Sequence, residues 1–141
     1  MSTIIYPRSP RETMCGWVHL PRFVDKLRLH LAGQLAVEYQ ENLTRGFDGR
    51  WLTAAGLDAA TFIEVVKNSI TDGEVADWVR KNVVRSEAEK AAFRDAILDY
   101  PKADDEVMQA RLRMRKEQAG LLQRAEIKTF VDFIDADEGR L

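Results

Sequence analysis

Apolar residues recur at helical spacing in the first third of this chain. The repeat falls three or four residues apart, at Leu20, Val24, Leu27, Leu31 and Leu35. Such a stripe lies on one face of an α-helix and predicts a buried contact along its whole length. Pro21 suits a first helical turn, where its missing N–H costs nothing. The pattern therefore predicts a helix from about Leu20 to Glu41.

Start signals predict three further helices. Asp58 can cap a helix whose apolar face continues to Ile70. Two capping boxes follow, in which the side chain of each residue accepts a hydrogen bond from the backbone N–H of the other. These boxes pair Thr71 with Glu74 and Ser86 with Glu89. Each predicts a helix start, and Pro101 ends the last of the three.

Shorter or less regular helical segments complete the chain. They are Arg50 to Ala55 before Gly56, Asp104 to Ala119 before Gly120, and a final turn set around Ile127 to Ile134. No segment alternates apolar and polar residues over five or more positions, as a half-buried strand would. We therefore expect an all-α fold, a compact orthogonal array of about six or seven helices without a sheet, as one domain over residues 1–141.

Residues 1–18 predict an extended arm rather than a helix. Pro7 and Pro10 each remove a backbone donor and favour extended geometry in the residue before them. The arm nevertheless carries several large apolar side chains, at Ile4, Ile5, Tyr6, Trp17 and Val18. Because this much apolar surface is unfavourable in water, we expect the arm to dock along the domain.

Composition narrows the class of protein. The chain has 141 residues, of which 45% are hydrophobic and 31% charged, and this excludes a disordered or collagen-like protein. Its 21 Lys and Arg residues are balanced by 23 Asp and Glu residues, which does not favour nucleic acid as a partner. One cysteine, Cys15, favours a reducing, cytoplasmic setting. Neither a leader peptide nor a membrane span is expected.

Some residues suggest chemistry, and each has a simpler structural explanation. Cys15 and His19 could form a nucleophile and base, but both residue types are also common as packed side chains. The basic run at Arg111, Arg113, Arg115 and Lys116 could contact phosphate, or it could complement the helix dipole. The C-terminal acids Asp132, Asp135, Asp137 and Glu138 could bind a cation, while Asp48-Gly49 and Asp72-Gly73-Glu74 are typical of turns and caps. No cofactor-binding motif is present, so no cofactor is expected.

Two longer segments carry a resemblance. They are Tyr6-Pro7-Arg8-Ser9-Pro10-Arg11-Glu12 and Gly16-Trp17-Val18-His19-Leu20-Pro21-Arg22-Phe23-Val24-Asp25-Lys26, and the chain closes with Val131-Asp132-Phe133-Ile134-Asp135 and Glu138-Gly139-Arg140. These resemble an uncharacterised bacterial family, a domain of unknown function with a Pro-Arg-Ser-Pro-Arg arm and a His-Leu-Pro-Arg helix start. The resemblance implies no catalytic residues, and it implies a small residue at position 15. It directs attention to Arg8, Arg11, His19, Arg22, Asp25 and Lys26.

These six residues give the main functional hypothesis. We expect a small helical domain that binds a partner protein or a small anionic ligand through the arm and the first helix. The same charged residues could instead hold the arm in place by binding its carbonyls and nearby carboxylates. A different hypothesis is a metal-dependent or acid/base enzyme that uses His19, Asp25 and the C-terminal carboxylates.

Overall fold

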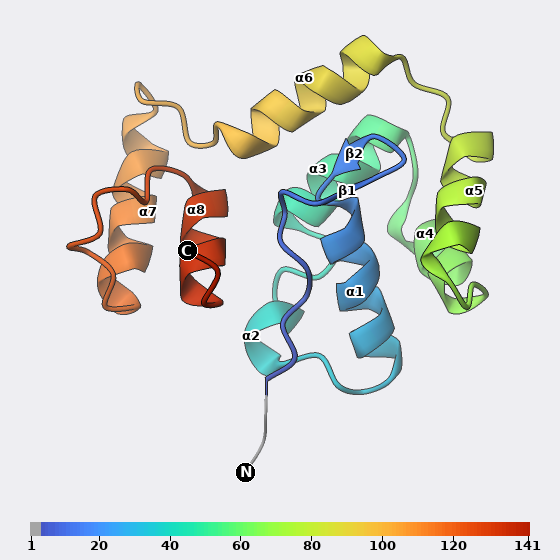
Figure 1. Ribbon diagram of the computed structural model, residues 1–141, viewed down its shortest axis with the longest axis horizontal. Coiled ribbons are helices and arrows are strands. Elements are labelled where there is room, and N and C mark those ends of the chain that lie inside the picture. The colour runs from blue at the N-terminus through green and yellow to red at the C-terminus, as the bar shows by residue number, and fades with distance from the viewer. Residues whose placement is uncertain (1–3) are drawn as a thin grey trace. The chain divides into compact units, whose positions relative to one another are not determined.

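The computed structural model describes residues 4–141, and these form eight helices and one small hairpin (Figure 1). The elements are β1 (Thr13–Met14), β2 (Trp17–Val18), α1 (Leu20–Leu31), α2 (Val37–Gln40), α3 (Gly46–Ala55), α4 (Ala59–Lys67), α5 (Asp72–Asn82), α6 (Glu87–Leu98), α7 (Glu106–Gln118) and α8 (Phe130–Asp137). The predicted all-α fold is confirmed. None of the helices within residues 4–141 has the length and apolar character needed to cross a membrane.

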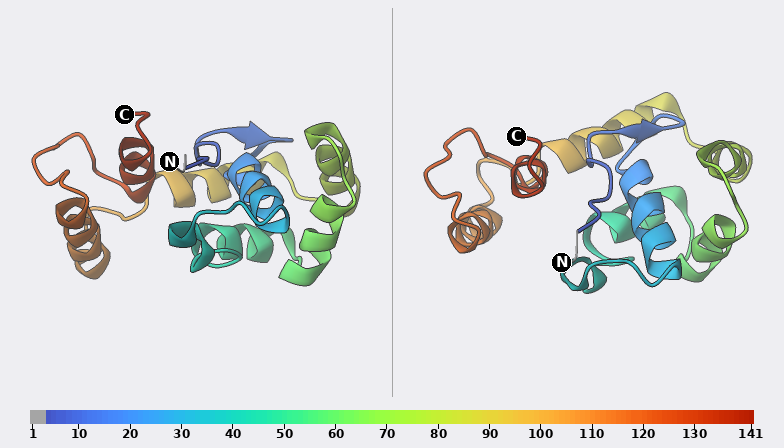
Figure 2. Two further views of the ribbon diagram at one scale, coloured as in Figure 1. Left: turned by 90° about the horizontal axis from the view of Figure 1, so that it is seen from below. Right: turned by 60° about the horizontal axis from the view of Figure 1, so that its bottom comes forward.

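The chain divides into two compact units, Met1–Arg94 and Asp95–Leu141, and α6 begins in the first and ends in the second. In the first unit, the arm runs alongside α1 in the opposite direction, and further views show the same arrangement (Figures 1 and 2). The prediction of a docked arm concerned residues 1–18, of which Met1, Ser2 and Thr3 lie outside the described residues.

The expectation of a fold without a sheet is wrong in one place. β1 and β2 pair antiparallel, with Thr13 opposite Val18 and Met14 opposite Trp17. The turn between them places Cys15 at φ 44° and Gly16 at φ 86°. Two consecutive positive φ values are typical of a tight hairpin turn. Strands of two residues are too short to show an alternation of apolar and polar residues, so the sequence pattern did not predict this hairpin. A small residue at position 15 suits this backbone.

The first predicted helix is shorter than its apolar stripe. α1 ends at Leu31, because Gly33 takes φ 69° and the N–H groups of Gly33 and Gln34 donate to the carbonyls of His30 and Leu29. This is a glycine-terminated helix end. Leu31 is consequently exposed, and the segment after it continues into the separate helix α2 rather than along α1.

The start signals of the later helices are confirmed. Asp58 accepts from the N–H of Thr61, and the Thr71–Glu74 box is complete. Ser86 and Glu89 bond reciprocally at the start of α6. Ile70, predicted on the buried face after Asp58, is exposed because α4 ends at Lys67.

An aromatic cluster forms the core of the first unit. Trp51 on α3 lies between the hairpin, α1 and α4, with ring-centre distances of 6.1 Å to Trp17, 6.1 Å to Phe23 and 4.8 Å to Phe62. All four side chains are buried. Edge-to-face and tilted aromatic contacts add to the free energy gained by burying the rings. The cluster thereby fixes α3 against both the arm and α1.

The second unit has a separate small core. Leu112 on α7, Ile127 and Phe133 on α8 pack together, and Leu121, Phe130 and Ala136 cover them. The ammonium of Lys116 donates to the carbonyls of Arg124 and Ile127, which fastens the segment between α7 and α8. Thr129 and Asp132 form a capping box at the start of α8.

Phe62→Ala should lower the free energy of unfolding by about 3–5 kcal/mol, because it opens a large cavity in the aromatic cluster. Denaturant unfolding monitored by circular dichroism measures this value. Val84→Ala is the matched control, since Val84 is 78% exposed and its truncation should change the free energy by less than about 0.5 kcal/mol. A cost below about 1 kcal/mol for Phe62→Ala would contradict the central role of the cluster.

Candidate functional site

His19 lies at a strained junction between the hairpin and α1. Its backbone has φ 70° and ψ −27°, a left-handed conformation that is uncommon outside glycine and asparagine. Its N–H donates to the carbonyls of Pro10 and Glu12, and its carbonyl accepts from Phe23 in the first turn of α1. This geometry reverses the chain and places the imidazole inside the first unit.

The carboxylate of Asp48 gathers three donors. Its Oδ1 lies 2.6 Å from Nε2 of His19, and its Oδ2 lies 2.7 Å from Nζ of Lys26 and 3.1 Å from the backbone nitrogen of Thr44. The side chains of Asp48, His19 and Lys26 are 0%, 2% and 7% exposed. These three residues, here named the buried charge cluster, connect α1 with α3 and with the loop before α3.

The electrostatics of the cluster favour a neutral His19. Burial lowers the pKa of His19 because water no longer solvates the imidazolium, and the hydrogen bond to Asp48 opposes this only in part. Burial alone would raise the pKa of Asp48, but the His19 hydrogen bond and the Lys26 charge outweigh it, so this pKa lies below its ordinary value. Lys26 and Asp48 therefore form the ion pair, and His19 donates through Nε2–H.

The other ring nitrogen of His19 agrees with this assignment. Nδ1 is buried and has no hydrogen-bond partner within residues 4–141. In the neutral form Nδ1 is an unpaired acceptor, whereas in the charged form it would be an unpaired N–H, which is more costly to bury.

Arg8 and Asp25 hold the arm against α1. The backbone nitrogen and Nε of Arg8 each lie 2.9 Å from Oδ2 of Asp25, and Nη2 lies 2.9 Å from Oδ1. Nη1 of Arg8 also lies 2.8 Å from Asp72 at the start of α5, and Arg28 on α1 pairs with the same carboxylate. Chiefly through the Asp25 hydrogen bonds, the pKa of Arg8 is held above its ordinary value.

Arg22 binds the backbone of the arm. It is 4% exposed, and its Nη1 donates to the carbonyl oxygens of Pro7 at 3.4 Å and Arg8 at 3.2 Å. Its guanidinium carbon also lies 5.5 Å from the ring centre of Tyr39. Arg11 differs from the other cations of the arm and α1, because its side chain is exposed.

The structure thus divides the six residues predicted from the sequence into groups. His19 and Lys26 meet at Asp48, Arg8 meets Asp25, Arg22 meets the arm carbonyls, and Arg11 has an exposed side chain. Sequence reasoning missed Asp48 and Asp72 as their partners. Asp48 did carry a signal, because it lies three, four and seven residues before Trp51, Leu52 and Ala55, which places a carboxylate on a buried helix face.

The sequence of this chain also matches one known protein family. The model of a protein family described as a domain of unknown function, DUF5069, matches residues 4–140. The chain belongs to the DUF5069 family. The expected membership of an uncharacterised domain family is confirmed, and no curated protein matches the chain.

The remaining candidate functional residues of the DUF5069 chain are Cys15 and the basic residues of α7, and neither set forms a site. Burial raises the pKa of the half-buried Cys15 thiol, which disfavours the reactive thiolate. On α7, Arg111 and Arg115 lie on one side of the helix, whereas Arg113 lies on the side of Glu106 and Glu117. The basic residues therefore do not form one continuous face.

Three of the four C-terminal acids form contacts within the second unit, and Asp137 is exposed. Asp132 completes the cap of α8, and Arg140 pairs with Asp135 and Glu138. Across residues 4–141, the His, Cys, Asp and Glu side chains form no group of three or more that could hold a metal ion.

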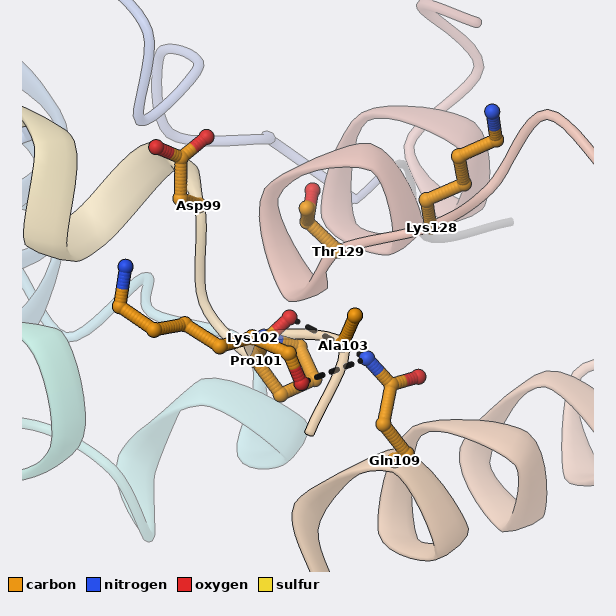
Figure 3. A pocket seen from close by; sticks show the side chains of 7 residues that line it. All are labelled: Asp99, Pro101, Lys102, Ala103, Gln109, Lys128 and Thr129. Atoms are coloured by element: carbon orange, nitrogen blue, oxygen red, sulfur yellow. Dashed lines mark hydrogen bonds between the residues drawn. The ribbon is translucent and has the colours of Figure 1, made fainter. Parts of the chain in front are cut away.

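A shallow cavity of about 440 Å³ in the second unit offers no convergent polar groups. It is lined by Asp99, Pro101, Lys102, Ala103, Gln109, Lys128 and Thr129. Gln109 uses its amide to donate to the carbonyls of Pro101 and Lys102, and the ammonium groups of Lys102 and Lys128 point away from each other (Figure 3).

Stability of the DUF5069 chain should rise with pH between about 5 and 7 through His19. The unfolded chain protonates His19 below its ordinary pKa of 6.5, whereas the folded chain resists protonation, so acid favours unfolding. The contribution is at most about 1.4 kcal/mol per pH unit for one proton. Urea unfolding at a series of pH values should show a smaller slope for His19→Asn, since asparagine tolerates the left-handed backbone. A slope in His19→Asn equal to that of the wild type would contradict the assignment.

Arg22→Met should lower the free energy of unfolding by about 1–3 kcal/mol, because the carbonyls of Pro7 and Arg8 lose a charged donor while the aliphatic stem is retained. The measurement is thermal or urea unfolding, with hydrogen exchange of the arm followed in parallel. Faster exchange of the N–H groups of Arg8 and Arg11 is expected. Unchanged stability and exchange would show that Arg22 does not hold the arm.

Proposed function

We propose that this DUF5069 chain is a protein-binding domain whose contact surface is formed by the arm and α1. The observation that carries the proposal is a run of three exposed apolar residues, Ile4, Ile5 and Tyr6, directly before the point where the arm is fixed to α1. Leu31, the last residue of α1, is also exposed. Contiguous apolar surface of this kind is typical of protein interfaces.

The charges around the arm support a protein partner over a small anion. Arg8 is bonded to two carboxylates, Lys26 to a third, and Arg22 to backbone carbonyls. An anionic ligand would have to displace these partners, and those of Lys26 and Arg22 are buried. Displacing a buried partner leaves an uncompensated charge, which is strongly unfavourable.

Burial also weighs against the acid/base alternative. A general base must come within hydrogen-bond distance of its substrate, and the imidazole of His19 is 2% exposed. Asp25, the second residue of that alternative, has both oxygens bonded to Arg8.

We further propose that this is a bacterial, cytoplasmic protein and that its partner is not a nucleic acid. A single half-buried cysteine is compatible with a reducing compartment. The two-sided distribution of arginines on α7 does not provide the single basic stripe that a duplex backbone requires.

Ile5→Asp should weaken the proposed protein contact at least about tenfold, because it places a charge in an apolar interface. Wild-type protein and the variant are immobilised in equal amounts and exposed to bacterial extract, and a protein retained only by the wild type is purified. Titration calorimetry with that purified protein then gives the two dissociation constants.

Val107→Asp is the matched control, since Val107 is equally apolar but lies on α7 and is 77% exposed. This variant should bind as the wild type does. A titration with inorganic phosphate, followed by the side-chain NMR signals of Arg8 and Arg22, should show no saturable change. Equal binding by wild type and Ile5→Asp, or saturable phosphate binding, would contradict the proposal.

A further inference from the structure

The segment Ile4–Tyr6 has an unused backbone as well as exposed side chains. Its three residues are 43%, 51% and 43% exposed. Within residues 4–141, neither the main-chain nor the side-chain groups of these three residues form a hydrogen bond. Residues 4–9 contain neither a helical turn nor a bend. Within the described residues, the segment therefore presents N–H and C=O groups without partners next to apolar side chains.

The residue types of the segment favour a β-strand. Isoleucine and tyrosine are among the residues most enriched in strands, and Pro7 restricts Tyr6 to extended geometry. The next residues are fixed, because Arg8 binds Asp25 and Arg22 binds the carbonyls of Pro7 and Arg8. The segment is thus held at one end and requires little further ordering before it pairs.

We propose that Ile4–Tyr6 adds as a strand to an open sheet edge of a partner protein. This inference rests on the proposed function and specifies how the partner is recognised. An unpaired extended segment is complemented by the unpaired N–H and C=O groups of a sheet edge, and alternate side chains enter pockets beside that edge. A helical partner would contact the side chains and leave the backbone unpaired.

A second copy of this chain is a weaker candidate for the same surface. Two arms could pair with each other, but three residues on each side bury far less than the about 1,200 Å² of a stable interface. A partner with its own sheet supplies further contact area around the added strand. Arg8 is already paired with Asp25 and Asp72, so charge does not select the partner here.

Strand addition makes a prediction that depends on residue parity. Neighbouring residues of a strand direct their N–H groups to opposite edges, so an added strand uses the N–H of either Ile5 or Tyr6, and not both. Proline removes an N–H, and alanine removes the side chain while it keeps the N–H. Because Ile5 and Tyr6 take part in no hydrogen bond within residues 4–141, Ile5→Pro, Tyr6→Pro, Ile5→Ala and Tyr6→Ala should all fold.

The probe is a phage-displayed library of a small β-sheet domain whose exposed edge strand is randomised, selected on the wild-type domain and counter-selected on Ile5→Asp. The enriched edge strands should be rich in β-branched and aromatic residues. One of the selected domains is purified and titrated by calorimetry against the four variants and the wild type. At one of the two positions, proline should raise the dissociation constant at least about tenfold above the value for alanine, and at the other position the two should agree within about twofold.

Each other outcome overturns the inference in a distinguishable way. Equal constants for proline and alanine at both positions would overturn strand addition and leave side-chain docking, and so the proposed function, intact. A library without edge strands that distinguish wild type from Ile5→Asp would overturn strand addition at this segment. A dimer in sedimentation that Ile5→Asp abolishes would assign the surface to a second copy instead.

Discussion

The arrangement of the first unit depends on one buried carboxylate. Asp48 accepts from His19, from Lys26 and from the backbone of Thr44, and so it joins the start of α1, the middle of α1 and the loop before α3. A buried ion pair adds little net stability compared with apolar packing, but the loss of one partner costs about 3–5 kcal/mol. The cluster therefore acts mainly as a constraint on geometry. It allows α3 to lie against α1 only where the three donors meet the carboxylate, and this placement brings Trp51 into the aromatic core.

The position of the arm depends on the same buried charge cluster, through His19. His19 can reach Asp48 because its left-handed backbone turns the chain between β2 and α1, and the same residue donates its N–H to the carbonyls of Pro10 and Glu12. The residue that orients the side-chain cluster thus also fixes the end of the arm. Arg8 and Arg22 fix the arm further along, and the described residues that precede these contacts, Ile4, Ile5 and Tyr6, are exposed. The proposed contact surface lies at Ile4–Tyr6, directly before the fixed part of the arm.

The sequence predicts the local features of this protein well and the long-range ones poorly. Capping boxes at Thr71 and Ser86 and the cap at Asp58 depend on residues three or four positions apart, so spacing alone identifies them. The end of α1 at Gly33 was also encoded locally, but the apolar stripe that continues to Leu35 concealed it. The sequence directs attention to Arg8, His19 and Lys26, but the carboxylates of Asp72 and Asp48 that they contact lie 22 to 64 positions away. Only the tertiary fold, which packs α3 against α1 and places Asp72 beside Arg8 and Arg28, brings these residues together. No pattern within one segment contains that information.

The way in which Arg22 binds the arm has an evolutionary consequence. Its guanidinium contacts backbone carbonyls, which every amino acid possesses, whereas the guanidinium hydrogen bonds of Arg8 to Asp25 require two particular side chains. The arm is therefore held by one contact that tolerates substitution in the arm and by one that does not. Sequence drift at position 7 would leave the Arg22 contact in place, provided that the new residue keeps the extended backbone. Drift at position 8 would require a compensating change at position 25 or 72, so these positions should vary together in related chains.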